Sequence, residues 1–368
     1  MGLTALQAHG EGLGAAEVGE YRGASTAVRF GDPQAEFAAL RDGCGVYDLG
    51  FRAKISLTGG DRVRWLNGMV TNNIRDLAEG HGVYAFLLNP QGRILGDLYA
   101  YHRGESIVVD TDCGQLEKIL ATFDHYIIMD DVEVKDLSAE ISALGISGPR
   151  SHEVLKSAGF AVGPLQALHV QTADWHGFEC TLVGGEDESR PAYEIWLAPD
   201  GVRPLWNALL EAGATPAGSE ALEMHRIVSG IPRYGVDIRE RDLPQETEQA
   251  RALNFNKGCY VGQEIVERIR SRGAVHRKFS GFLVEGNAQI ASGTKIVVAE
   301  KEVGEITSVA SVRLANQAKT IALGYIRREL GTPGREVMIG TEKAIVIQVP
   351  SSEKVGSQTE AALQQHPA

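Results

Sequence analysis

The residues best suited to chemistry lie in one glycine-rich stretch, Lys257-Gly258-Cys259-Tyr260-Val261-Gly262-Gln263-Glu264. The thiol of Cys259 can attack an electrophile or bind a metal once it is deprotonated. Lys257 lies two residues before it, and an apolar period of three to four residues predicts a helix from Gln263 onward. A nearby cation and a helix N-terminus both stabilise a thiolate, so we expect a reactive cysteine. The alternative is a small buried cysteine that only packs.

Three other side chains have types that suit a ligand site. Arg226 lies in a predicted helix, and its guanidinium can hold a carboxylate or a carbonyl through two parallel donors. Glu194 lies in the strand-like stretch 193–197, where a carboxylate can accept paired N–H donors from a ring. Asp97 follows a predicted hairpin turn at 89–92. The plainer alternatives are an exposed helix arginine and a solvent-facing strand glutamate. No histidine or cysteine has the spacing of a zinc site, so we predict no metal.

The elements that must position these side chains change character along the chain. Strands and helices alternate up to about residue 275, and an apolar face repeating every three to four residues predicts a helix over 115–125. From 276 to 350, short strands separated by Gly-rich turns predict a small β-barrel. Residues 1–22, rich in Gly, Ala and Glu, predict a flexible arm, and the polar residues 351–368 predict a disordered tail.

Charge and composition exclude several classes of protein. The formal net charge of −12 argues against a nucleic-acid-binding protein, although residues 268–278 form a local basic run. No apolar run is long enough to span a bilayer, and the N-terminus reads neither as a secretory signal nor as a transit peptide. The four cysteines are widely spaced, which fits a reducing cytoplasm better than a disulfide framework.

The stretch from Lys257 to Glu264 resembles the signature of the YgfZ family of folate-binding proteins, whose fold resembles the T-protein (aminomethyltransferase) of the glycine cleavage system. The resemblance covers roughly residues 37–349. It implies an α+β fold: a three-domain cloverleaf around a central folate channel, with two interleaved α/β domains within 23–275 and a C-terminal β-barrel at 276–350. It also implies that tetrahydrofolate, or a folate derivative, is the cofactor.

The resemblance further implies roles for single residues. The T-protein pattern R-x-x-x-G-x-x-x-Y-G-x-D-I matches this chain from Arg226 and includes Tyr234, which implies that both residues contact the folate. The G-x-E-I strand of T-proteins matches Glu194, which implies contact with the pterin. Lys257 is expected beside the cofactor and Cys259 in the catalytic role.

One position departs from the T-protein pattern. T-proteins carry two adjacent aspartates after the hairpin turn, the first of them near N5 of the folate. Here Gly96 takes the first place and only Asp97 remains as a candidate catalytic acid. A site without a placed carboxylate loses an electrostatic partner for a developing cation.

These observations leave three functions open. The leading hypothesis is a tetrahydrofolate-binding protein that uses Cys259 to support assembly or repair of iron–sulfur client proteins. The alternative is an aminomethyltransferase that moves a one-carbon unit from a lipoyl-bound aminomethyl group to tetrahydrofolate. The third is a scaffolding protein without folate affinity.

Overall fold

The computed structural model describes residues 2–8, 14–187, 190–273, 275–285, 290–314 and 317–348. The tail predicted at 351–368 lies outside the described residues. The chain divides into two compact units, Met1–Ala85 with Leu98–Leu222 and Phe86–Asp97 with Glu223–Ala368. No helix in the described ranges combines the length and the apolar composition that crossing a bilayer requires.

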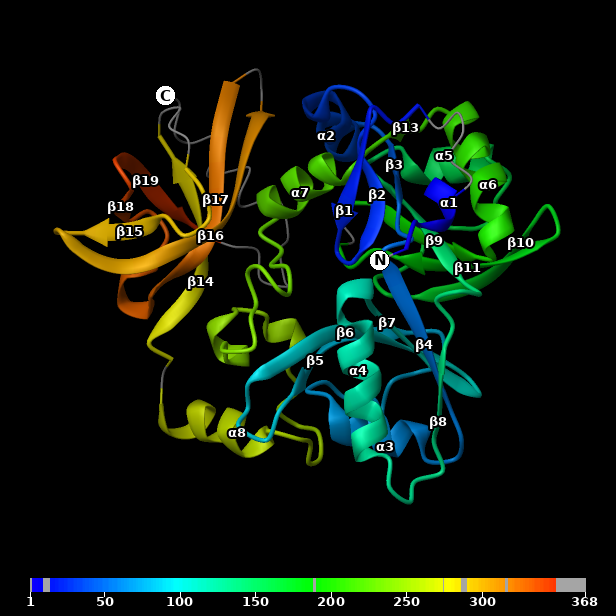
Figure 1. Cartoon of the computed structure of the whole chain (residues 1–368), viewed down its shortest axis with the longest axis horizontal. Helices are drawn as coiled ribbons and strands as arrows, with labels where there is room; N and C mark the ends of the chain where they lie inside the picture. Colours follow the sequence, from blue (N-terminus) through cyan, green and yellow to red (C-terminus); the bar gives the residue numbers. More distant parts are fainter. Residues whose placement is uncertain are drawn as a thin grey trace. The chain divides into compact units, whose positions relative to one another are not determined.

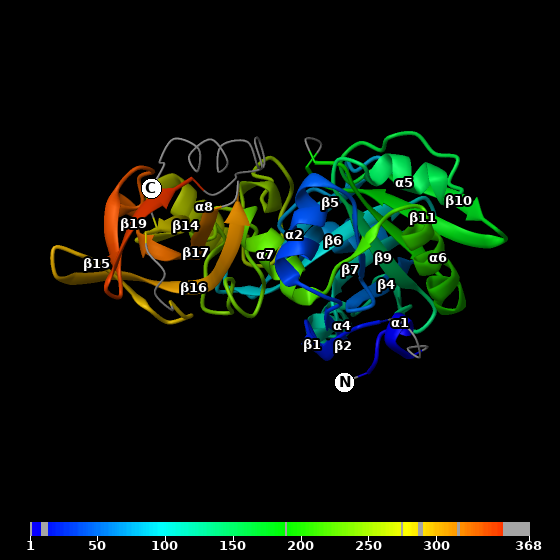
Figure 2. The same ribbon diagram turned by 90° about the horizontal axis from the view of Figure 1, so that it is seen from above.

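The first unit contains a six-stranded sheet with the order β10-β11-β12-β9-β3-β13. Tyr193, Ile195 and Leu197 alternate along β12 and bury one face of this sheet, as period-2 geometry requires. Helices α5 (Ser151–Ser157) and α6 (Pro199–Glu211) pack on that face (Figures 1 and 2). The strands are β3 (Gly45–Asp48), β9 (Ser142–Ser147), β10 (Val170–Trp175), β11 (Phe178–Gly184), β12 (Ala192–Leu197) and β13 (Thr215–Pro216).

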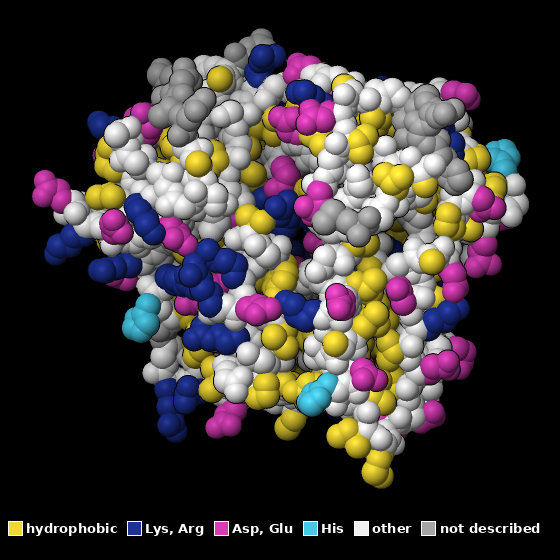
Figure 3. Space-filling model, viewed as in Figure 1, with side chains coloured by type: hydrophobic (Ala, Val, Ile, Leu, Met, Phe, Trp, Pro, Cys, Tyr) yellow, Lys and Arg dark blue, Asp and Glu magenta, His cyan; other side chains and the backbone are white. Residues whose placement is uncertain are grey.

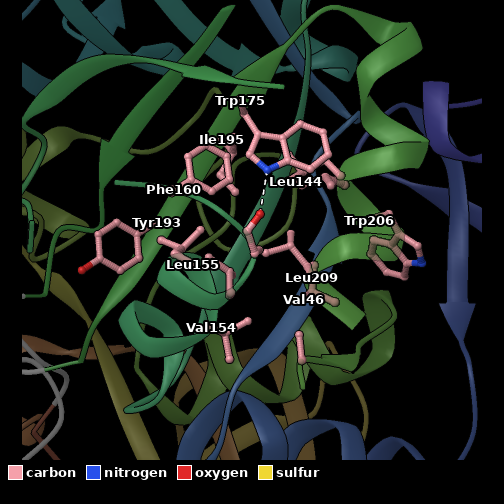
Figure 4. Close-up of a cluster of buried hydrophobic side chains, with 14 of the residues drawn as sticks. Val46, Leu144, Val154, Leu155, Phe160, Trp175, Tyr193, Ile195, Trp206 and Leu209 are labelled. Carbon is pink, nitrogen blue, oxygen red and sulfur yellow. Dashed lines mark hydrogen bonds between the residues drawn. The ribbon is translucent and has the colours of Figure 1, made fainter. Parts of the chain in front are cut away.

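Aromatic side chains fill the core between this sheet and its helices. Figure 4 shows Trp175 beside Phe160 and Leu155, and the Trp175 indole N–H donates to the carbonyl of Ala158 at 2.8 Å. Trp206 of α6 lies in the same cluster, 1% exposed. The buried ring nitrogen of Trp175 therefore has a hydrogen-bond partner, as burial of a polar atom demands.

A second sheet has the order β5-β6-β7-β4-β8. Helices α3 (Arg62–Met69) and α4 (Cys113–Tyr126) accompany it, and Trp65 packs edge-on against Phe123 with ring centroids 5.1 Å apart. The helix predicted over 115–125 is α4, and the predicted hairpin is formed by β5 and β6. The strands are β4 (Arg52–Thr58), β5 (Gly82–Leu88), β6 (Ile94–Arg103), β7 (Ser106–Asp112) and β8 (Glu133–Asp136).

The N-terminal residues differ from the expected flexible arm. Helix α1 (Ala5–Ala8) buries Leu6 completely, and β1 (Glu17–Tyr21) pairs with β2 (Ala24–Arg29), ahead of helix α2 (Pro33–Asp42). The hydroxyl of Thr4 donates to the buried carboxylate of Asp48. A few apolar and polar anchors therefore order a segment whose Gly-rich composition alone suggested disorder.

The second unit contains the predicted barrel, which is confirmed as a closed six-stranded barrel of order β14-β17-β16-β15-β18-β19. Figures 1 and 2 show these strands curling around one core, which includes Phe282, Ile296 and Ile326. The strands are β14 (Arg277–Val284), β15 (Lys295–Val298), β16 (Lys301–Leu314), β17 (Gln317–Arg327), β18 (Glu336–Ile339) and β19 (Glu342–Ile347). The helices before or beside them are α7 (Ser219–Val228), η1 (Pro244–Glu246), η2 (Ala250–Ala252), α8 (Gln263–Arg272) and η3 (Arg328–Leu330).

Candidate functional site

A ladder of opposite charges crosses β4 and β7 in the first unit. The strand register places Lys54 directly opposite Asp110, and Arg52 directly opposite Asp112. Lys54 Nζ lies 2.7 Å from Asp110 Oδ1, and Arg52 Nη1 lies 2.6 Å from Asp112 Oδ1. The side chains of Lys54 and Asp110 are both fully buried. Directly opposed residues on one sheet face are neighbours, so the register itself forms this cluster.

The two cations keep Asp110 ionised inside the protein. Burial alone would raise the pKa of this carboxyl, but Arg52 and Lys54 together hold it below its usual value. Arg52 also reaches Asp110 directly, with 2.5 Å between Nη2 and Oδ2. Asp110 therefore supplies a negative charge close to Glu194, which lies on β12 of the other sheet of this unit.

Glu194 lies on β12 at the edge of this cluster and is partly exposed. Its Oε2 accepts a hydrogen bond of 2.9 Å from Trp196 Nε1, and within the described part of the chain no donor reaches Oε1. Burial, and next the charge of Asp110, raises the pKa of Glu194. A carboxylate with one open oxygen at a partly exposed position can still accept donors from a ligand.

The sequence motif that identified Glu194 does not identify the charged and aromatic residues around it. These residues are Arg52, Lys54, Asp110, Asp112 and Trp196. The available signal was two cations at alternate positions, Arg52 and Lys54, in the strand-like stretch around residue 55 and two acids at alternate positions ending β7. Such charges within buried strands require partners.

Asp97 lies in β6, half-buried, and its neighbour Gly96 is buried. Successive strand residues face opposite sides, so these two positions point to different faces of β6. Asp97 therefore does not present its carboxylate on the face where a side chain at position 96 would lie.

Arg226 differs from the expected ligand clamp. Its guanidinium is 5% exposed and donates to Asp237 Oδ2 at 2.7 Å, to Glu223 Oε2 at 2.7 Å and to Ser308 Oγ at 3.0 Å. A further donor reaches the carbonyl of Ile231 at 2.7 Å. The donors that a ligand would need are thus used to join α7 to the loop after it and to the barrel strand β16.

Tyr234 also bonds within the protein. Its hydroxyl donates to the carbonyl of Leu95 at 2.5 Å, and Leu95 belongs to the hairpin segment of the second unit. Tyr234 therefore anchors the hairpin that carries Asp97.

The stretch around Cys259 is confirmed as a loop that leads into a helix, α8, beginning at Gln263. Gly262 has a φ of +82°, and a Cβ there would lie 2.6 Å from the carbonyl oxygen of Asn89. Only glycine fits this conformation and this close approach without strain. The hairpin turn and the loop therefore pack directly against each other.

Lys257, which was expected as a cation near Cys259, is buried. It is 7% exposed, and its Nζ lies 5.0 Å from the ring centroid of Tyr260. Burial lowers the pKa of Lys257 to about 7, so near neutral pH a large share of this side chain is uncharged. The expectation that a full positive charge at Lys257 stabilises the thiolate of Cys259 is therefore weakened.

The four cysteines differ in exposure. Cys259 is exposed, whereas Cys44 and Cys180 are buried and Cys113 is half-buried. Burial raises the pKa of Cys44 to about 12 and that of Cys180 to about 11. Among the described residues, no group of three or more His, Cys, Asp or Glu side chains could hold a metal ion.

Basic side chains gather on one face of the second unit. Figure 3 shows Lys and Arg over β14 and α8, the elements that contain the basic run predicted at 268–278. Arg270 stacks over the ring of Phe255 with 4.4 Å between the guanidinium carbon and the centroid. This basic surface contrasts with the formal net charge of −12 of the whole chain.

Comparison with known proteins agrees with this architecture. The GCVT N-terminal domain matches residues 9–257, and the glycine cleavage T-protein C-terminal barrel domain matches residues 277–352. The chain belongs to the glycine cleavage T-protein family. The expected α/β fold with a C-terminal barrel is confirmed, whereas membership of the narrower YgfZ family stays a prediction.

Individual relatives cover nearly the whole chain. An aminomethyltransferase of Rubrobacter xylanophilus is 30% identical over 91% of this chain and 90% of its own length. A putative chloroplastic transferase of Arabidopsis thaliana is 28% identical over 85% and 72%. The solved aminomethyltransferase T of Bartonella henselae superposes with a TM-score of 0.85 at 20% identity, covering 97% of this chain and 99% of that one. The T-protein fold therefore extends across the chain.

Proposed function

We propose that this chain binds tetrahydrofolate or a close derivative, with Glu194 as the acceptor for the pterin ring. The observation that carries this proposal is the partly exposed Glu194 carboxylate, which has one oxygen open beside a buried charge cluster. A pterin offers an amino group and a ring N–H side by side, a donor pair that fits a carboxylate. Membership of the T-protein family supports the same ligand.

The activity that the relatives favour is transfer of a one-carbon unit to tetrahydrofolate. Relatives named aminomethyltransferase match the chain over most of its length. In this function the folate would supply the nitrogen that accepts the carbon, and the chain would bind and orient the pterin. Asp97 is the candidate acid, held in its strand next to the anchor that Tyr234 makes with Leu95.

A second function is favoured by the exposed Cys259. It is the exposed one of the four thiols, in a loop held tightly by Gly262, while Gly96 stands where T-proteins carry an acid. In this function the folate-binding chain would use Cys259 to maintain iron–sulfur client proteins, and Lys257 would line the same loop.

Calorimetry with the wild type and Glu194→Gln tests the folate site. We expect micromolar binding by the wild type, weakened in the variant by about 1–3 kcal/mol, because a ligand donor pair would lose its charged acceptor. Glu179→Gln, an exposed glutamate on the neighbouring strand β11, is the matched control and should bind as the wild type does. Equal affinities of the wild type and Glu194→Gln would refute the assignment.

A reconstituted reaction with an aminomethyl-loaded lipoyl carrier separates the two activities. One-carbon transfer predicts that methylenetetrahydrofolate forms and that Cys259→Ser leaves its rate unchanged. The thiol function predicts no product, and loss of cellular iron–sulfur enzyme activity in Cys259→Ser while folate binding persists. Rapid alkylation of Cys259, followed by mass spectrometry against Cys44 and Cys180, checks that the thiol is available.

A further inference from the structure

We propose that Lys54 and Trp196 are positioning residues that fix the carboxylate of Glu194 in one orientation for its ligand. This inference rests on the proposed folate-binding role of Glu194. It assigns a role to two buried side chains that lie outside the sequence motifs and come from different strands, β4 and β12.

The first link is the fixed ammonium group of Lys54. Its Nζ is held 2.7 Å from Asp110 Oδ1 and lies 4.7 Å from the centre of the Trp196 ring. Because the side chain is fully buried, water does not compete for either interaction. Lys54 therefore holds its amine end in a fixed position over the indole.

The second link is the indole of Trp196, which is 2% exposed. Tyr101 packs edge-on against it with ring centroids 5.2 Å apart. Glu194 and Trp196 are two residues apart on β12, so they share one face of the strand, and the indole N–H reaches Glu194 Oε2 at 2.9 Å. Lys54 and Tyr101 thus restrain the indole ring from two sides, and its single N–H donor points at the carboxylate of Glu194.

These contacts form a chain from Asp110 through Lys54 and Trp196 to Glu194. A cation over the ring draws electron density from the indole and makes its N–H a stronger donor. The donor fills one oxygen of Glu194 and leaves the other for a ligand. A carboxylate that is already oriented binds with less loss of rotamer freedom.

The charged and titratable groups that face Glu194 oppose one another. Burial and Asp110 raise its pKa, whereas Lys54, Arg52 and the indole donor lower it. The nearby hydroxyls of Tyr47 and Tyr101 have pKa values raised above the usual range by burial, so they are neutral and add no charge at neutral pH. Removing Lys54 or the indole N–H therefore takes away one of the three groups that oppose protonation of Glu194, which raises its pKa further.

The test compares Trp196→Phe with Trp175→Phe, in the full chain. Trp175 is the matched control because it is also buried in the first unit and also donates one hydrogen bond, to the carbonyl of Ala158. Two readouts are used: carbon-13 NMR titration of the labelled glutamate side chains without ligand, and the affinity for 5-formyltetrahydrofolate between pH 5.5 and 8.

In Trp196→Phe we expect Glu194 to titrate about one pH unit higher than in the wild type and the affinity at pH 7 to fall about tenfold. Lys54→Gln should move the titration in the same direction, whereas Trp175→Phe should leave both readouts unchanged. An unchanged Glu194 titration in Trp196→Phe, or an equal change in Trp175→Phe, would overturn the proposal. A normal titration shift with no ligand binding by any protein, wild type included, would instead refute the folate function.

Discussion

Two buried lysines show how differently the two units treat the same side chain. Lys54 lies on a strand, where the register places Asp110 directly opposite it and a 2.7 Å ion pair forms. Lys257 lies in a loop against the ring of Tyr260, and burial lowers its pKa to about 7. A strand thus supplies a lysine with a fixed countercharge, whereas the loop holds a lysine that loses its proton near neutral pH.

The difference matters for chemistry. A paired lysine is a stable source of positive charge and can hold neighbouring groups in place. A buried lysine with a lowered pKa has a large neutral fraction at pH 7. Lys257 therefore gives less positive charge to stabilise the thiolate of Cys259. Lys54 in the sheet of the first unit is therefore a better source of positive charge for a ligand site than Lys257 in the motif loop.

The largest expected effect follows from breaking the ion pairs of Asp110. Asp110→Asn should lower the free energy of unfolding by about 3–5 kcal/mol at pH 7, because Arg52 and Lys54 would lose their buried countercharge. The pKa of Asp110 is lower in the folded chain, so its stabilisation is present above the usual aspartate pKa and is lost on acidification. Urea unfolding at pH 7 and again at about pH 2, below the usual aspartate pKa, measures this.

The control for that variant is Asp76→Asn, at an exposed ion pair with Arg75. No measurable change in stability is expected there, because solvent screens exposed pairs. An Asp110→Asn protein as stable as the wild type would mean that the strand ladder does not stabilise the first unit.

The next largest effect has the opposite sign and concerns Lys257. Lys257→Met should raise the melting temperature at pH 6, where the wild type must bury an ammonium group, with a gain on the order of 3 kcal/mol. Between pH 7 and the ordinary lysine pKa of 10.5, the unfolded chain holds a proton that the folded chain has lost. Wild-type stability therefore rises with pH in this window, and the gain from Lys257→Met should shrink by pH 9.5.

Differential scanning calorimetry at the two pH values, beside the exposed-site control Lys301→Met, measures this difference. A gain that is the same at pH 6 and pH 9.5 would show that the lysine is protonated in the folded state throughout, and the contrast with Lys54 would disappear.

The smallest effect concerns the glycines of the motif loop. Gly262→Ala should cost about 1–3 kcal/mol, because position 262 has a positive φ and its Cβ would press on the carbonyl oxygen of Asn89. Gly258→Ala is the matched control, since a Cβ there meets no atom within 4 Å. Thermal melts of both variants measure the costs, and equal costs would mean that the loop is not held against the hairpin turn.

The sequence predicted the elements well where a local period determines the structure. The short strands after residue 276 and the helix from Gln263 follow from the spacing of apolar residues and from glycine turns, and both are confirmed. The N-terminal segment could not be predicted from composition, because single anchors such as Leu6 order it through contacts far along the chain.

The candidate site was less predictable, because strand register and burial are not local properties. The pairing of Lys54 with Asp110 joins residues 56 positions apart, and no pattern in either strand specifies that register. Motif spacing singled out Lys257 and Arg226, but the burial of both side chains and the lowered pKa of Lys257 depend on the tertiary fold. Motif spacing found Glu194, whereas the neighbours that govern its carboxylate came only from the structure.

The hairpin segment Phe86–Asp97 has a consequence for dissecting the protein. It belongs by its contacts to the second unit, through Tyr234 and Gly262, although its flanking strands continue in a sheet of the first. The chain therefore passes between the units three times, and neither unit is one uninterrupted length of polypeptide. A fragment that starts near residue 223 would lack the hairpin, and one that ends there would carry it without its anchors. Expressing either half alone requires circular permutation or an added hairpin peptide rather than a single truncation.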